Sequence, residues 1–180
     1  IEARFQQRKP VDGKDILALE GFAFEHRDGP LQPQLSRALV HGYALGGDFS
    51  AAFAHAKEVP ALEPDVWMLL ADVGGESQLL TFAVGLEPSR RAALPLATRS
   101  KIAARLVDAG LPNAASAWTQ SGDIEASLAA RVALANGDAG AALQMLSAQL
   151  PDADPDLLAA SYTALGEFDA AATAYQTAGD

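Results

Sequence analysis

A turn centred on glycine recurs along most of this chain at intervals of about thirty residues. The turn glycines lie 28, 35, 27 and 29 residues apart, at Gly47, Gly75, Gly110, Gly137 and Gly166. Each turn lies between two segments whose apolar residues follow helical spacing, so each joins two predicted helices. One such pair cannot bury its apolar stripe alone, whereas pairs stacked on their neighbours can. The recurrence therefore predicts a helical solenoid, ahead of a bundle packed around one central core.

Composition supports an entirely helical chain. The sequence contains 39 alanines, which raise helix propensity and let helix axes approach closely. Alternating β-branched runs are few, and no Asn-Gly or Asp-Gly turn joins two of them. The sequence therefore predicts an all-α fold.

The predicted helix pairs divide the chain into about five units, which together form one repeat domain over residues 34–180. Their approximate bounds are 34–60, 62–87, 96–121, 123–150 and 155–179. In the first unit, Leu35, Leu39 and Tyr43 form the apolar stripe, Gly46-Gly47 ends the first helix, and Pro60 stops the second.

These units resemble tetratricopeptide repeats. The last copy matches best, with Leu158-Ala159, Tyr162, Gly166, Phe168, Ala171, Tyr175 and Ala178 at the signature spacing. The copy at 62–86 deviates most, and the spacings below 34 suggest shortened helices or loops. The resemblance implies antiparallel helix pairs in a right-handed superhelix. It also implies that Phe168 seals the joint between its two helices and that Ala171 is small because the facing helix passes over it.

Residues 1–33 do not follow the repeat. We expect an N-terminal loop and a short capping element that packs on the first helix pair. Residues 6–15 read as a polar loop, and residues 26–34 as a linker. Between them, residues 16–26 fit a short helix better than an edge strand, with Ile16, Leu19 and Phe22 or Ala23 facing inward.

Charge is unevenly spread along the chain. The formal net charge is −10, and residues 122–180 hold nine acidic residues against one basic residue, Arg131. Nucleic acid is a poor partner for such a chain, because phosphate binding needs clustered Lys and Arg. An anionic membrane surface is disfavoured for the same reason, and no apolar run approaches the length of a membrane span. The acidic third either faces a basic partner or keeps an alanine-rich surface soluble.

The absence of cysteine excludes disulfides, thiolate metal ligands and cysteine nucleophiles. It favours an exported bacterial protein slightly, in the periplasm or envelope, without fixing the compartment. The chain starts at Ile1 rather than at a methionine, so we expect a mature product or an excised fragment.

No sequence motif indicates catalysis. His26, His41 and His55 lack the spacing of a zinc site, and the chain has no nucleophile elbow and no phosphate-binding loop. The run DADPD, Asp152–Asp156, lacks the glycine and glutamate of a calcium loop and fits capping residues at a helix start better. We therefore expect no catalytic residue, no metal and no cofactor.

The predicted solenoid has a concave wall formed by the first helix of each unit. Alignment of the units also places Asp65, Leu69 and Ser127 near that wall. The candidate partner-binding residues on it are Arg37, His41, Asp72, Lys101, Arg105 and Arg131. Arg105 and Arg131 would lie on adjacent units and clamp a carboxylate through paired donors. The alternatives are that Arg131 only neutralises nearby acidic groups and that His41 is a buried structural residue.

Three functions follow from this fold. The first is a non-catalytic scaffold that binds a peptide or helix of another protein in its groove. The second is a structural or assembly section of a larger, membrane-anchored envelope protein that acts through self-association, as a homo-oligomer or as part of a longer chain. The third is an accessory helical domain of an enzyme whose catalytic part lies outside this chain.

Overall fold

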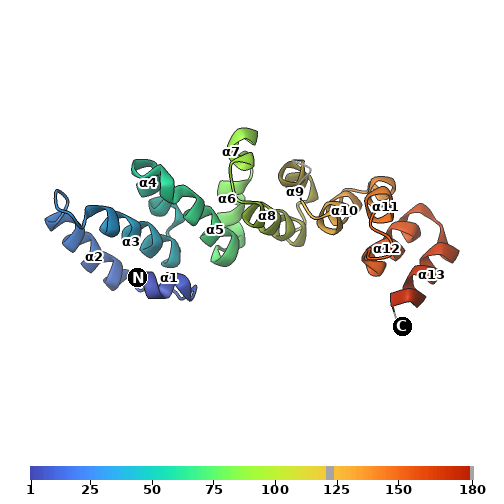
Figure 1. The fold of residues 1–180 in the computed structure, drawn as a ribbon, viewed down its shortest axis with the longest axis horizontal. Helices are drawn as coiled ribbons and strands as arrows, with labels where there is room; N and C mark the ends of the chain where they lie inside the picture. The colour runs from blue at the N-terminus through green and yellow to red at the C-terminus, as the bar shows by residue number, and fades with distance from the viewer. Residues whose placement is uncertain (121–123, 179–180) are drawn as a thin grey trace. The chain divides into compact units, whose positions relative to one another are not determined.

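The computed structural model describes residues 1–120 and 124–178 (Figure 1). Every regular element in this part of the chain is a helix, as predicted, and no strand occurs in it. The chain forms two compact units, residues 1–85 and residues 86–180. The predicted division between residues 33 and 34 falls inside the first unit.

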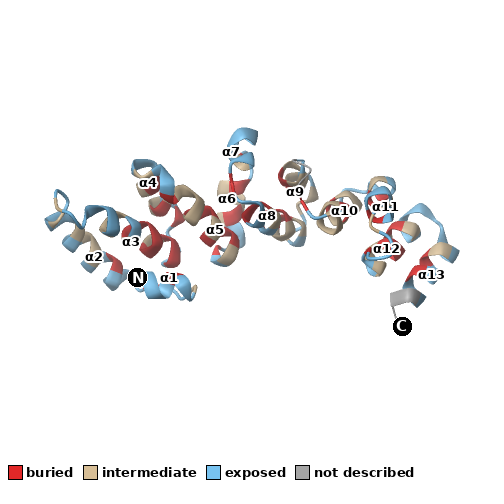
Figure 2. Cartoon of the chain, in the orientation of Figure 1, coloured by how far each residue is buried: buried red, intermediate tan, exposed pale blue. Residues whose placement is uncertain are grey.

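The first unit contains six α-helices and one short 3-10 helix among its described residues. They are α1 (Glu2–Gln6), α2 (Gly13–Glu25), α3 (Gln32–Leu45), α4 (Phe49–Glu58), the 3-10 turn Pro60–Leu62, α5 (Glu63–Val73) and α6 (Glu76–Ala83). Helix α3 is central, because it contacts α1, α2, α4 and α5. Buried side chains of α3 include Leu39, Val40 and Ala44, and those of the neighbouring α4 and α5 include Phe49 and Leu69. Figure 2 shows the buried parts of α3, α4 and α5 in red.

The second unit contains seven helices in its described residues. They are α7 (Pro88–Ala92), α8 (Leu96–Asp108), α9 (Pro112–Thr119), α10 (Ala126–Ala135), α11 (Ala139–Ser147), α12 (Pro155–Leu165) and α13 (Phe168–Ala178). Helices α8 and α9, α10 and α11, and α12 and α13 pack as consecutive pairs, and α10 also contacts α8 and α12. The short helix α7 buries none of its residues.

Four of the predicted turn glycines lie in the left-handed region of backbone space. Their φ angles are 84°, 74°, 83° and 80° for Gly47, Gly110, Gly137 and Gly166. A side chain is strained in this conformation, which explains why glycine recurs there. The fifth, Gly75, has a φ of −70° and is the N-cap of α6, while Gly74 ends α5. The turn between α5 and α6 therefore differs from the other four.

Aspartates cap the helices that follow several of these turns. Asp48 and Asp138 accept hydrogen bonds from the backbone amides three residues later, at 2.9 and 3.0 Å. Asp154 accepts from the amides of Asp156 and Leu157 at the start of α12, at 3.0 and 3.2 Å. The predicted capping role of the DADPD run is thus confirmed for Asp154.

The N-terminal region is more helical than the sequence indicated. Helix α2 begins at Gly13 rather than Ile16, because the Asp12 side chain caps it by accepting from Lys14 N at 3.0 Å. Ile16 is buried as expected, but Phe22 is exposed and its ring lies 4.2 Å from that of His26. Of the two residues predicted as alternatives to face inward, Ala23 is half-buried and Phe22 is not buried.

The prediction for Phe168 is also wrong. Its side chain is 68% exposed, so it does not seal the joint between α12 and α13. The alanine positions behave as expected, since Ala171 is buried, as are its counterparts Ala52, Ala115 and Ala142. Helix α13 packs chiefly on α12 among the described residues, and this contact does not bury Phe168.

Tyr43 links α3 to α2, and its ionisation provides a test of this contact. Its hydroxyl donates a hydrogen bond to Glu20 Oε1, and its ring stacks on His55 at 5.1 Å. Burial, the hydrogen bond to Glu20 and the negative charges of Glu20 and Asp48 raise the pKa of Tyr43 from 10.0 to about 12. Because the neutral phenol is favoured in the folded state, its contribution to stability is complete below pH 10 and is lost as the pH rises towards 12.

We expect the absorbance of tyrosinate at 295 nm to report this shift. The difference between the titrations of the unchanged chain and Tyr43→Phe should have a midpoint at about pH 12. In a Glu20→Gln background the midpoint should move towards 10, because both the carboxylate acceptor and its charge are gone. A midpoint near 10 in the unchanged chain would contradict the contact.

Candidate binding surface on helices α3 and α5

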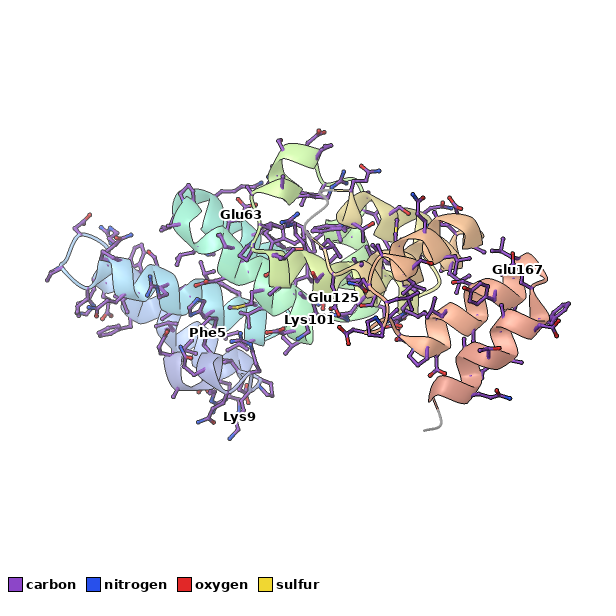
Figure 3. All side chains as sticks on the ribbon, turned by 45° about the vertical axis from the view of Figure 1, so that its right-hand side comes forward. Phe5, Lys9, Glu63, Lys101, Glu125 and Glu167 are labelled. Atoms are coloured by element: carbon purple, nitrogen blue, oxygen red, sulfur yellow. The ribbon has the colours of Figure 1, made fainter. Side chains whose placement is uncertain are left out.

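The N-terminal segment, residues 1–8, lies across α3 and α5 in the first unit. Figure 3 marks Phe5 where this segment meets α3. The Phe5 ring stacks face to face on the His41 ring, with centroids 3.7 Å apart and planes 6° from parallel. Phe5 is buried, and burial of a phenyl side chain contributes about 1.5–3 kcal/mol. An aromatic contact therefore holds the middle of the segment to α3.

His41 lies between two carboxylates from different elements. Its Nδ1 is 3.3 Å from Glu2 Oε2 of α1, and its Nε2 is 2.9 Å from Asp65 Oδ2 of α5. Both contacts are N–H···O hydrogen bonds when the ring is doubly protonated. Only 1% of His41 is exposed. His41 therefore joins α1, α3 and α5 from inside the unit.

Arg8 holds the other end of the segment. Its Nε donates to Asp72 Oδ2 at 2.7 Å, and its Nη2 approaches Met68 Sδ at 3.3 Å, so both contacts are with α5. The guanidinium also lies 5.0 Å from the centroid of the Phe5 ring. Such partly exposed ion pairs contribute roughly 0–1 kcal/mol. The ion pair with Asp72 thus orients the Arg8 side chain but contributes little to the free energy that holds the segment on α5.

The backbone of Arg8 is in an unfavourable conformation. Its φ angle is 52°, and it is the only non-glycine residue with a positive φ in the described residues. This left-handed conformation costs an ordinary residue roughly 1–2 kcal/mol. Backbone hydrogen bonds close this turn at the end of α1, from Arg8 N to Phe5 O at 3.1 Å and from Lys9 N to Arg4 O at 2.9 Å.

An open hollow adjoins the segment at its Glu2 end. It has a volume of about 540 Å³ and is lined by Glu2, Pro33, Gln34, Arg37 and Ala38. Arg37 is exposed there and makes no hydrogen bond or ion pair with any described residue. The surface on α3 thus continues beyond α1 as a hollow that contains an exposed guanidinium.

The three predicted site residues of the first unit differ in exposure and in their contacts. Arg37 is exposed, as a binding residue requires. Asp72 is half-buried and paired with Arg8, so the chain itself occupies it. The prediction that His41 faces an open groove is wrong, because His41 is buried; the alternative, a structural histidine, fits its contacts.

In the second unit, one of the two arginines of the predicted carboxylate clamp, Arg131, is paired within the chain. Lys101 is exposed and Arg105 is half-buried on α8. Arg131, on α10, forms an ion pair with Asp108 at the end of α8. This pairing corresponds to the alternative role predicted for Arg131, which is to neutralise a neighbouring acidic group.

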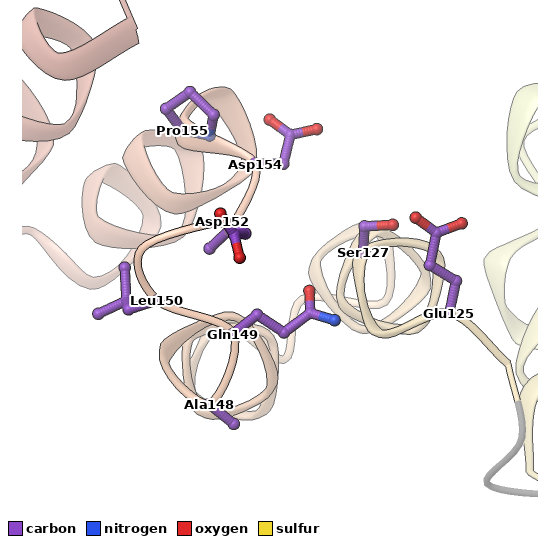
Figure 4. Close-up of a pocket in the computed structure, with 9 residues that line it drawn as sticks. Glu125, Ser127, Ala148, Gln149, Leu150, Asp152, Asp154 and Pro155 are labelled. Atoms are coloured by element: carbon purple, nitrogen blue, oxygen red, sulfur yellow. The ribbon is translucent and has the colours of Figure 1, made fainter.

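Three acidic side chains line an open hollow of about 720 Å³ in the second unit (Figure 4). Glu125 and Ser127 come from the start of α10, and Asp152 and Asp154 from the connection into α12. Asp154 already accepts two backbone hydrogen bonds. In the described residues, no group of three His, Cys, Asp or Glu side chains is placed to hold a metal ion. The hollow is therefore an open acidic surface.

Sequence reasoning missed the N-terminal segment as part of a site. Glu2 and Phe5 lie three residues apart in α1, which brings them towards one side of the helix, and Arg8 follows at the same interval just after it. That spacing was the available signal. The sequence predicts only a non-repeating cap here, because the segment is short and the residues that it contacts on α3 and α5 lie far away in the sequence.

The comparisons with known proteins found no match to this chain. No family model matches the sequence, and neither the curated proteins nor the solved structures contain a match. No described helix has both the length and the apolar character needed to cross a membrane. The function must therefore be inferred from the geometry of the chain itself.

Proposed function

We propose that this chain is a non-catalytic protein-binding module of the tetratricopeptide-like kind. In this proposal the helix pairs stack in chain order, and the first helices of neighbouring pairs form a surface that receives a short segment of a partner protein. The contacts of α3 with α5, of α8 with α10 and of α10 with α12 support such stacking within each unit.

One observation carries the proposal. Residues 1–8 lie on α3 and α5 and use an aromatic stack, a carboxylate and a guanidinium to do so. A short amphipathic helix that binds in a groove likewise lays an apolar anchor on it, as Phe5 does here. The exposed Arg37 beside the segment supplies a further contact for an acidic partner residue.

Site-specific photo-crosslinking in the organism that makes this chain tests the proposal. We expect a photo-reactive amino acid at Gln34, in the hollow beside Arg37, to capture a defined partner protein. The same probe at Glu58, exposed at the end of α4, serves as the matched control and should not capture it. Adding Arg37→Glu should reduce the capture at least tenfold, because the substitution reverses the charge that an acidic segment would meet.

Two results would contradict a binding surface at this place. One is equal capture from Gln34 and Glu58, which would indicate random encounters. The other is capture from Gln34 that Arg37→Glu leaves unchanged.

A further inference from the structure

We infer that residues 1–8 are a displaceable internal ligand, and that the partner segment which replaces them carries a carboxylate, an aromatic ring and a guanidinium at three-residue intervals. This inference rests on the proposed function, because it names the chemistry of the partner and the element that competes with it. The three side chains in the chain's own segment are Glu2, Phe5 and Arg8.

Each of these three side chains meets a complementary group on the surface. Glu2 faces the Nδ1 atom of His41, and Phe5 stacks on the same ring. Arg8 reaches Asp72 and the sulfur of Met68. The surface thus offers a cationic or donor edge, an aromatic face and a carboxylate in that order, which a segment of the same pattern and direction would fit.

The surface remains assembled when the segment leaves. His41 is held from α5 by Asp65, whose Oδ2 lies 2.9 Å from Nε2. Helix α5 is anchored by its own buried residues, including Val66, Leu69 and Leu70, none of which belongs to the N-terminal segment. The positions of Asp65, Met68 and Asp72 are therefore set by the packing of α5 and not by α1.

The segment itself is poorly suited to remain in place. Helix α1 has five residues and no side-chain hydrogen bond at its N-cap, and isolated helices of this length are not stable. Glu2 is 57% exposed on its side chain, so water competes for its contact with His41. Arg8 is in the left-handed region of backbone space, which is unfavourable for an arginine. A partner segment that avoids these losses would displace it.

The hollow beside Glu2 offers a further contact to a partner segment. A partner segment that continues past the position of Glu2 would enter the space lined by Pro33, Gln34 and Arg37. Arg37 has no partner among the described residues, so an acidic residue preceding the three-residue pattern would find a guanidinium there.

A peptide added to the full-length chain tests the inference. The probe is the acetylated, fluorescein-labelled peptide IEARFQQRKP, which has the sequence of residues 1–10. The receptor is the full chain with Phe5→Ala and Arg8→Ala, which removes the stack and the ion pair that hold its own segment. The matched control is the full chain with Gln6→Ala and Gln7→Ala, two exposed positions on the same segment.

We expect the peptide to bind the Phe5→Ala, Arg8→Ala chain at least tenfold more tightly than the control chain, as measured by fluorescence anisotropy. Peptides with the phenylalanine or the second arginine replaced by alanine should each bind at least fivefold more weakly. Adding Asp72→Asn to the receptor should weaken the unaltered peptide but leave the peptide without that arginine unaffected, because the two groups form one contact.

Several outcomes would overturn the inference. They are equal binding to both chains, binding that ignores the phenylalanine and the arginine, and no binding to a receptor whose circular dichroism spectrum is still helical. If the receptor loses its helical spectrum, the single variant Arg8→Ala replaces it, and the same outcomes decide. Concentration-dependent dimerisation of the unchanged chain that Phe5→Ala abolishes would assign the surface to a second copy instead. Failure of the peptide together with specific crosslinking at Gln34 would reject the pattern and retain the proposed function.

Discussion

Replacing Phe49 with alanine should destabilise the first unit by about 3–5 kcal/mol. Phe49 is 2% exposed at the start of α4, which packs against both α3 and α5. Truncation of the ring removes the free energy of burying it and leaves a cavity that three surrounding helices cannot fill without moving. Urea denaturation with hydrogen exchange of the α3 and α4 amides would measure the loss.

Phe168→Ala is the matched control for this change. Both phenylalanines stand two residues after a left-handed turn glycine, Phe49 after Gly47 and Phe168 after Gly166. Because Phe168 is 68% exposed, its truncation should change stability by no more than about 0.5 kcal/mol. If the two substitutions cost the same, the burial difference between these equivalent positions would be wrong.

This pair of residues shows how far the repeat pattern predicts structure. Local features were predictable, because a left-handed turn selects glycine and a capping position selects aspartate whatever the surroundings. Gly47, Gly137 and Asp154 follow these rules in the structure. Burial of Phe168 was not predictable from its motif, since burial depends on whether another helix lies over that side.

The candidate site was predicted only in part for a related reason. Arg37 is exposed on α3 as expected. His41, however, contacts Glu2, which lies 39 positions earlier in the chain, and Asp72 contacts Arg8, which lies 64 positions earlier. Contacts over such separations are not encoded in the spacing of residues along one helix. The repeat pattern therefore placed Arg37, His41 and Asp72 on α3 and α5 without the N-terminal segment that contacts two of them.

Ala142→Leu should destabilise the second unit by about 1–3 kcal/mol. Ala142, on α11, is fully buried in a cluster with Ala130, Leu146 and Ala159 from α10, α11 and α12. A leucine adds three carbons where neighbouring helices already touch, so side chains must leave their preferred rotamers or the helices must separate. Ala135→Leu, at an exposed position on α10, should stay within about 0.5 kcal/mol.

A compensating substitution separates close helix packing from other causes. Leu146 lies one helical turn after Ala142 and is also fully buried in the same cluster. Leu146→Ala alone should cost about 2–5 kcal/mol through its cavity. If Ala142 is small because α10 and α12 pass close to it, the added leucine of Ala142→Leu should partly fill the space that Leu146→Ala vacates. The double substitution should then cost at least about 1 kcal/mol less than the sum of the two single changes. Strict additivity in denaturant titrations would show that the two sites do not share one packed volume, and close helix approach would then not explain the recurring alanines.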